Sequence, residues 1–262
     1  MPATANPGHE KSQSVIRRQY ARAPIVEAVL EILADVPADI TPEVLGNQLE
    51  SERPKYDQRL DVSTFETGLT FDATGVTPLS TPQRELLGYM FVDTRNHRSF
   101  QVRRNGFLHS KQAPYEKWES LRDEARRLWQ LYLAAARPTL VRRLGLRYIN
   151  RLDLPVGAPD LKEYLLTGPE IAPGIAQSLS GYTMQLDIPQ TDIPNCLLVI
   201  REAIVKPPRP DVFSVVFDMD ILNGQQFSPS DAAIWTALEQ MHARADEVFE
   251  RSITDRVREL IA

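Results

Sequence analysis

The fold is decided by the segment Pro24-Ile25-Val26-Glu27-Ala28-Val29-Leu30-Glu31-Ile32-Leu33. Its aliphatic and β-branched residues predict a β-strand, in which successive side chains point to opposite faces. Positions 26, 28, 30 and 32 then form an apolar face that packs into the core. The other face carries two carboxylates, Glu27 and Glu31.

A segment in mid-chain has the same alternation with the opposite charge. Residues 143–154 predict a strand with Leu144, Leu146 and Tyr148 on one face. Its other face carries three guanidiniums, those of Arg143, Arg147 and Arg151. The two strands hold equivalent places in two similar halves of the chain, so we expect them to lie side by side.

The elements that follow the first strand are a short helix, more strands and a long helix. Thr41-Pro42 predicts the start of the short helix, a loop follows over 53–61, and strands follow over 62–71 and 86–93. Asn105-Gly106 predicts a hairpin between 99–104 and 107–111. From Pro114, apolar residues at spacings of three and four predict a long amphipathic helix.

The second half repeats this order of elements. We expect a short helix over 160–166, strands over 182–188, 197–204 and 212–221, and a final helix from Ser228-Pro229 that Ser252 interrupts. The predicted fold is therefore α+β, with two similar halves of three or four antiparallel strands after the first. The helices would pack on one face of a curved sheet, the topology of the TATA-binding protein. Chance agreement in element order is the alternative, since the residues themselves do not repeat.

The expected organisation is a flexible tail over 1–19, a first half over 20–138 and a second over 139–262. No stretch approaches the roughly 20 apolar residues that cross a bilayer, and the polar N-terminus has no apolar signal core. With one cysteine there is no disulfide framework, and Cys196 in its apolar run is interpreted as a buried thiol. We expect a cytoplasmic protein without membrane contact.

Charge is distributed unevenly along the chain. Residues 1–151 contain 22 Lys and Arg against 18 Asp and Glu, a balance of +4, whereas residues 152–262 contain 8 against 17, a balance of −9. The negative total disfavours general affinity for nucleic acid, which requires a field of basic residues. A local basic surface on the first half stays open.

If the strands over 24–33 and 143–154 are neighbours, the glutamates of the first lie beside the arginines of the second. Both groups would then lie on the sheet face that the helices leave uncovered. The candidate ligand-binding residues are Glu27, Glu31, Arg143, Arg147, Asn150 and Arg151. Cross-strand ion pairs that join the halves are the favoured interpretation, since charges on an open face usually pair or meet solvent. The functional alternative is a site where guanidiniums bind a carboxylate or phosphate.

Other motifs are weaker. Asp218 and Asp220 could share a divalent cation, but a solvated strand face explains them without a third ligand. The four histidines lack zinc-site spacing, and His242 is interpreted as a packing residue. Glycine-rich phosphate loops and the G-x-S-x-G nucleophile motif do not occur. We therefore predict no catalytic residue, metal or cofactor.

Three segments resemble a sporadically distributed, uncharacterised bacterial protein family. They are Ala23-Pro24-Ile25-Val26-Glu27-Ala28, then Arg143-Leu144-Gly145-Leu146-Arg147-Tyr148-Ile149-Asn150, and the closing segment from Phe249 to Thr254. The resemblance spans residues 20 to 260. The patchy distribution of that family implies an accessory gene, such as a gene of a defence or toxin–antitoxin module.

Three functions follow as hypotheses. The first is a non-catalytic binding or interaction protein that acts with a protein partner encoded nearby. The opposite charge balances of the two parts of the chain favour electrostatically steered docking of such a partner. A homodimer is an alternative assembly. The second is nucleic-acid binding through a saddle-like sheet, with Arg103, Arg104, Arg143, Arg147 and Arg151 on one surface. The third is an enzyme that acts on an anionic small molecule between Glu27 and Arg147.

Overall fold

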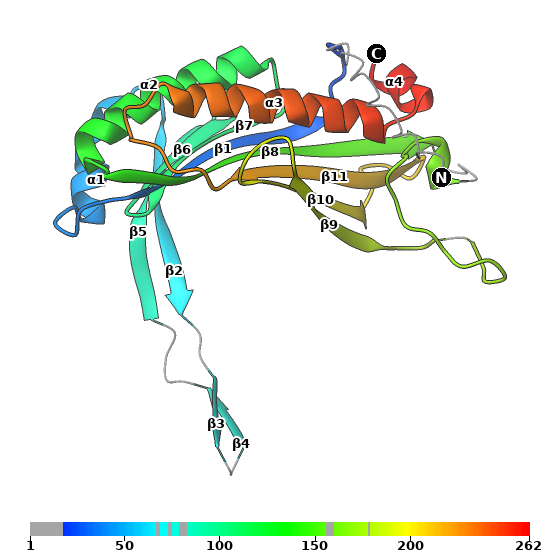
Figure 1. Ribbon diagram of the computed structural model, residues 1–262, viewed down its shortest axis with the longest axis horizontal. Coiled ribbons are helices and arrows are strands. Elements are labelled where there is room, and N and C mark those ends of the chain that lie inside the picture. The colour runs from blue at the N-terminus through cyan, green and yellow to red at the C-terminus, as the bar shows by residue number, and fades with distance from the viewer. Residues whose placement is uncertain (1–17, 67–68, 73–74, 79–82, 156–159, 178) are drawn as a thin grey trace, which may run out of the picture.

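The structure is a computed structural model that describes residues 18–66, 69–72, 75–78, 83–155, 160–177 and 179–262. Most of the predicted tail over 1–19 therefore lies outside the described residues. Within them the chain is an α+β protein with a large antiparallel sheet and four α-helices packed against it (Figure 1). The predicted class is confirmed.

The large sheet contains nine strands, each antiparallel to its neighbours. Their order is β2 (Gln58–Glu66), β5 (Gln83–Asp93), β6 (Arg98–Arg103), β7 (Gly106–Gln112), β1 (Ile25–Asp35), β8 (Leu140–Pro155), β11 (Val212–Asn223), β10 (Cys196–Val205) and β9 (Thr183–Gln190). A separate hairpin pairs β3 (Leu69–Asp72) with β4 (Gly75–Pro78). Figure 1 shows β2 and β5 continuing beyond the sheet as an arm that points away from the long helices and leads to this hairpin.

The two strands of opposite charge are neighbours at the middle of the sheet. β1 pairs with β8 along most of its length, with Glu31 opposite Gly145 and Val29 opposite Arg147. The apolar faces of both strands are buried, and Leu30, Ile32, Leu144 and Leu146 have no exposed surface. The predicted adjacency and both predicted core faces are confirmed.

The helices cover the apolar face. α2 (Trp118–Ala136) and α3 (Ala233–Ser252) run along the sheet, and α1 (Pro42–Gln48) packs beside α2 over β5 and β6 (Figure 1). The core beneath them is rich in aromatic rings, and Trp129 stacks on Tyr132 with ring centroids 5.1 Å apart. A second, smaller core includes Leu154, Tyr164 and Ile253 and lies with α4 (Asp255–Ile261).

A hairpin joins β6 to β7 as predicted, but its turn is one residue earlier than expected: the turn residues are Arg104 and Asn105, and Gly106 begins β7 opposite Arg103. Gly106 has a φ of +145°, and a Cβ atom there would lie 2.3 Å from the carbonyl oxygen of Ile32. Only glycine permits this conformation and this close approach to β1. The turn therefore sets how closely the hairpin lies beside the central strand.

Five predicted elements differ in the structure. The first long helix begins at Trp118 rather than at Pro114. Residues 160–166 form only the 3₁₀ turn η2 (Leu161–Glu163), and a similar turn, η1 (Glu50–Glu52), follows α1. β2 begins at Gln58, inside the expected loop, because its residues pair with β5. The final helix begins at Ala233 rather than at Ser228-Pro229, and Asp231 Oδ1 accepts a hydrogen bond from the Ala233 backbone nitrogen at 2.8 Å. The break near Ser252 is confirmed, but the residue before α4 is Thr254.

Among the described residues, no helix is both long enough and apolar enough to cross a membrane. Cys196 is buried as predicted, with 6% of its surface exposed.

Candidate functional site

The first site candidate is the charged surface on the sheet face opposite the long helices. Glu31 lies between two arginines from different strands. Arg103 donates to its Oε1 at 2.7 Å from β6, and Arg143 donates to its Oε2 at 2.8 Å from β8. Both carboxylate oxygens of Glu31 are therefore engaged, as expected for a charge-assisted network.

Arg147 has a different partner from the expected one. It donates two hydrogen bonds to Asp218, from Nε at 2.8 Å and from a terminal nitrogen at 2.7 Å. Asp218 lies on β11, the other neighbour of β8, and is 3% exposed. The hydrogen bonds that Arg147 donates to Asp218 raise the pKa of Arg147, whereas Glu27 contributes only a smaller electrostatic effect. The expected opposition of Glu27 and Arg147 is wrong as a direct contact.

Asp218 and Asp220, considered above as ligands of a divalent cation, are held by arginines. Arg201 lies 3.5 Å from Asp218 Oδ2 and 3.4 Å from Asp220 Oδ2. Burial raises the pKa of Asp220, and Arg147 and Arg201 oppose that shift. Within the described residues, no group of three or more His, Cys, Asp or Glu side chains could hold a metal ion.

The six candidates thus do not form one site. Glu27, Glu31, Arg143, Arg147 and Arg151 lie on the uncovered face, where Arg151 pairs with Asp153 at 3.1 Å. Asn150 points to the helix side, because neighbouring residues of a strand face opposite ways. It is 1% exposed, and its side-chain amide donates to the Phe217 carbonyl at 3.1 Å.

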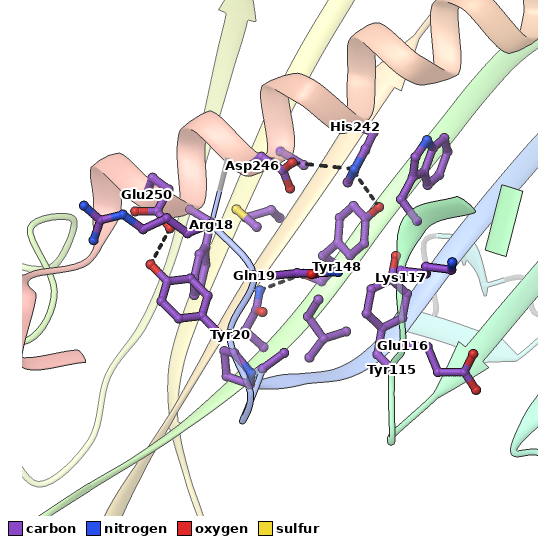
Figure 2. A pocket seen from close by; sticks show the side chains of 18 of the residues that line it. Arg18, Gln19, Tyr20, Tyr115, Glu116, Lys117, Tyr148, His242, Asp246 and Glu250 are labelled. Carbon is purple, nitrogen blue, oxygen red and sulfur yellow. Dashed lines mark hydrogen bonds and ion pairs between the residues drawn. The ribbon is translucent and has the colours of Figure 1, made fainter. Parts of the chain in front are cut away.

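The helix side holds a cavity of about 370 Å³, which we call the α3 cavity. It lies between α3, the start of β1, the middle of β8 and the start of α2, with residues 18–20 at its edge (Figure 2). Its aromatic lining residues are Tyr20, Tyr115, Trp118, Tyr148 and Phe249. Its polar lining residues include Asn150, His242, Asp246 and Glu250.

A chain of polar contacts crosses this cavity from the sheet to α3. The Tyr148 hydroxyl lies 3.0 Å from His242 Nδ1, and His242 Nε2 lies 3.5 Å from Asp246 Oδ2. Figure 2 shows the imidazole between the phenol and the carboxylate. One neutral tautomer satisfies both contacts, with Tyr148 donating to Nδ1 and the hydrogen of Nε2 directed at Asp246.

Aromatic contacts hold the same imidazole from the side. Trp118 stacks on His242 with ring centroids 4.6 Å apart, and its indole nitrogen donates to Glu239 at 2.9 Å. Tyr115 meets Tyr148 edge to face at 6.0 Å. The walls of the cavity are therefore ordered by packing as well as by hydrogen bonds.

Tyr20 lines the other end of the cavity. Its hydroxyl donates to Glu250, and its ring meets Phe249 edge to face at 6.4 Å. Burial and the neighbouring Glu250 carboxylate raise the pKa of Tyr20. Arg258 also donates to Glu250, at 3.1 Å, so this carboxylate is balanced by a cation outside the cavity lining.

A smaller cavity of about 180 Å³ adjoins the first and shares Tyr115, Glu116 and Lys117 with it. His109 lines it, and burial lowers the pKa of this imidazole to about 4. His109 Nδ1 lies 2.9 Å from the Ser99 carbonyl oxygen, which fits a neutral ring that donates to the backbone.

The sequence reasoning found little of the α3 cavity. It assigned Tyr148 to the core face and His242 to packing, and it did not consider Asp246. The available signal was the spacing of His242 and Asp246, since residues four apart lie on one face of a helix. The three segments that carry the family resemblance do meet here, contributing Pro24, Tyr148, Asn150 and Phe249 to the lining.

An α+β protein with a cavity between its sheet and its helices is the class that fold and site define. No protein-family model matches the chain, and no curated protein is significantly similar to it. The family resemblance stays a prediction.

Proposed function

We propose that this protein is a non-catalytic binding protein whose ligand is a small organic molecule held in the α3 cavity. The observation that carries the proposal is the convergence of five aromatic side chains and the polar contacts of Tyr148, His242 and Asp246 on one cavity of about 370 Å³. Ligand sites in proteins are typically concave, of roughly 300–1,000 Å³, and mostly apolar with a few fixed polar groups.

The polar groups of the cavity are oriented before a ligand arrives. Tyr148, His242 and Asp246 hold one another, and Trp118 restrains the imidazole by stacking. Pre-organised groups lose little freedom when they bind a ligand. The arrangement therefore suits recognition.

The charged sheet face supports an enzyme or a nucleic-acid-binding protein less well than the α3 cavity supports a ligand-binding protein. An enzyme at Glu27 and Arg147 requires an arginine that is available to an anion, but Arg147 makes two hydrogen bonds to Asp218. Nucleic-acid binding requires a continuous positive surface, but Arg103, Arg143 and Arg151 each pair with a carboxylate. Paired charges release fewer counterions from a phosphate backbone.

A protein partner encoded nearby and a homodimer stay predictions. The uncovered sheet face and the arm that β2 and β5 form are the surfaces on which a partner would be sought (Figure 1).

We also infer an internal duplication of the fold, with halves over 20–138 and 139–262. Outward from β1 the strands are β7, β6, β5 and β2, and outward from β8 they are β11, β10 and β9. In both series the last strand of the half lies next to the first, and a long helix follows it. This mirrored order supports the TATA-binding-protein-like topology, although the second series has one strand fewer and η2 replaces α1.

The ligand proposal is tested by closing the mouth of the cavity. Ala23 is exposed and lines the cavity, so Ala23→Trp would place an indole in the opening without removing a core contact. Ala21→Trp adds the same side chain at an exposed position outside the lining. A panel of small molecules is screened by thermal shift and native mass spectrometry against the wild type and both variants.

We expect at least one compound to bind the wild type and Ala21→Trp with the same affinity, and Ala23→Trp at least ten-fold more weakly. A panel without any ligand, or a ligand indifferent to Ala23→Trp, would show that the cavity is not the binding site.

A further inference from the structure

The aromatic rings of the α3 cavity form two groups with space between them. Tyr20 and Phe249 meet edge to face at one end, and Tyr115 and Tyr148 meet edge to face at the other. Figure 2 shows Tyr20 and Tyr115 on opposite sides of Tyr148, below α3. The face of an aromatic ring carries partial negative charge, so such surfaces attract organic cations.

The charged residues of the lining point to the same class of ligand. Four are acidic, Glu116, Glu119, Asp246 and Glu250, and two are basic, Arg18 and Lys117. Both basic residues are exposed, whereas Asp246 and Glu250 are partly buried one turn apart on α3. Glu250 accepts hydrogen bonds from Tyr20 and Arg258, and Asp246 lies beside the imidazole of His242.

The geometry at His242 fits a neutral imidazole beside a charged Asp246 carboxylate. In the neutral tautomer that satisfies Tyr148 and Asp246 together, the imidazole donates a hydrogen to the carboxylate without cancelling its charge. The N-terminus of α2, which would attract an anion, carries Glu119 in its first turn. The cavity thus combines aromatic faces with a lining that has more acidic than basic side chains.

We propose that the α3 cavity selects a small organic cation, an amine or quaternary ammonium group attached to an apolar body. This inference rests on the proposed function, since it names the chemical class of the ligand for the same cavity. The cationic group would lie near Asp246 and the tyrosine rings, and the apolar body would extend between Phe249 and Trp118.

Three probes of nearly equal shape separate charge from size: choline, its neutral isostere 3,3-dimethyl-1-butanol, and the anion 3,3-dimethylbutyrate. Binding to the full chain is measured by NMR titration, which detects dissociation constants in the millimolar range. We expect choline to bind at least ten-fold more tightly than the alcohol, and the anion most weakly.

Two variants connect that preference to the cavity. Asp246→Asn should reduce the preference for choline over the alcohol to about three-fold or less, and Tyr115→Leu should weaken choline more than the alcohol. Glu247→Gln is the matched control, because Glu247 is the next residue of α3, pairs with Arg244 and Arg251, and does not line the cavity. It should leave the preference unchanged.

The inference is overturned if the alcohol or the anion binds as tightly as choline, or if none of the three binds while an uncharged compound of the screening panel does. In both cases the proposed function stands. If no compound of any class binds the cavity, the proposed function fails as well.

Discussion

At the scale of single residues, Glu202 is a carboxyl group whose burial disfavours its charged form. It is fully buried in β10, where the Tyr182 hydroxyl donates to its Oε2 at 3.0 Å. Its Oε1 has no hydrogen-bond partner among the described residues. Burial raises the pKa of this carboxyl from 4.5 to about 7, against the opposing effect of Tyr182.

This shift predicts a stability that falls as the pH rises. Between pH 4.5 and about 7 the unfolded chain loses the proton of Glu202 while the folded chain retains it, so ionisation favours unfolding. Glu202→Gln removes that proton equilibrium. We expect the variant to gain stability over the wild type by on the order of 2–3 kcal/mol at pH 8 and much less at pH 4.5.

Urea unfolding of both proteins at several pH values measures this difference. A variant with the same dependence on pH as the wild type would show that Glu202 is not the group responsible.

At the scale of elements, the charged face joins neighbouring strands by ion pairs of unequal strength. The Arg147–Asp218 pair links β8 to β11 through two hydrogen bonds, and its acid is almost fully buried. The Arg142–Asp35 pair links β8 to β1, but its side chains are 57% and 36% exposed. Exposed ion pairs are typically worth about 0–1 kcal/mol, whereas hydrogen bonds to buried charges are worth more.

A double-mutant cycle measures this contrast. We expect Arg147→Met and Asp218→Asn each to lower the free energy of unfolding by about 1–3 kcal/mol, with a coupling energy of about 1–2 kcal/mol. The equivalent cycle with Arg142→Met and Asp35→Asn should give a coupling below about 0.5 kcal/mol. Equal coupling energies in the two cycles would contradict the prediction that the more buried pair, Arg147–Asp218, is the stronger one.

At the scale of the whole molecule, the proposed duplication places a boundary between α2 and β8. Residues near both ends of the described chain are adjacent, since the Arg22 backbone nitrogen donates to the Ile261 carbonyl at 3.0 Å. Adjacent ends permit circular permutation. A chain that runs from 139 to 262 and continues through a short linker into 20–138 therefore keeps both proposed halves intact.

We expect this permutant to fold with a native circular dichroism spectrum and to be more stable than a permutant opened at 224/225, inside the second half. Thermal unfolding compares the two. A permutant opened at 138/139 that does not fold, or is the less stable of the two, would count against two equivalent halves.

The sequence predicted the local elements well because their signals are local. Alternation in 24–33 identified a strand and its core face, Asn105-Gly106 identified the hairpin, and spacings of three and four identified both long helices. Errors occurred where tertiary contacts override local propensity, as at 160–166, where the chain is held against the α3–α4 junction and forms only a short turn.

The candidate site was predicted less well because side-chain partners depend on more than strand order. Arg147 was correctly placed on the uncovered face, yet β8 has two neighbours, and the buried acid of β11 binds it rather than Glu27 of β1. Alternation along β8 shows on which face Arg147 lies, but it does not show whether its partner comes from β1 or from β11.

By itself, the sequence determined the fold class and the faces of the two central strands, because periods of two and 3.6 residues record which side of an element is buried. The pairing of β1 with β8 was expected from their equivalent places in two similar halves, and the structure shows it. Only the tertiary structure decided the α3 cavity. Its walls come from positions as distant as 20, 115, 148 and 242, and contacts such as the one of 3.0 Å between Tyr148 and His242 exist only once the helices have packed across the sheet.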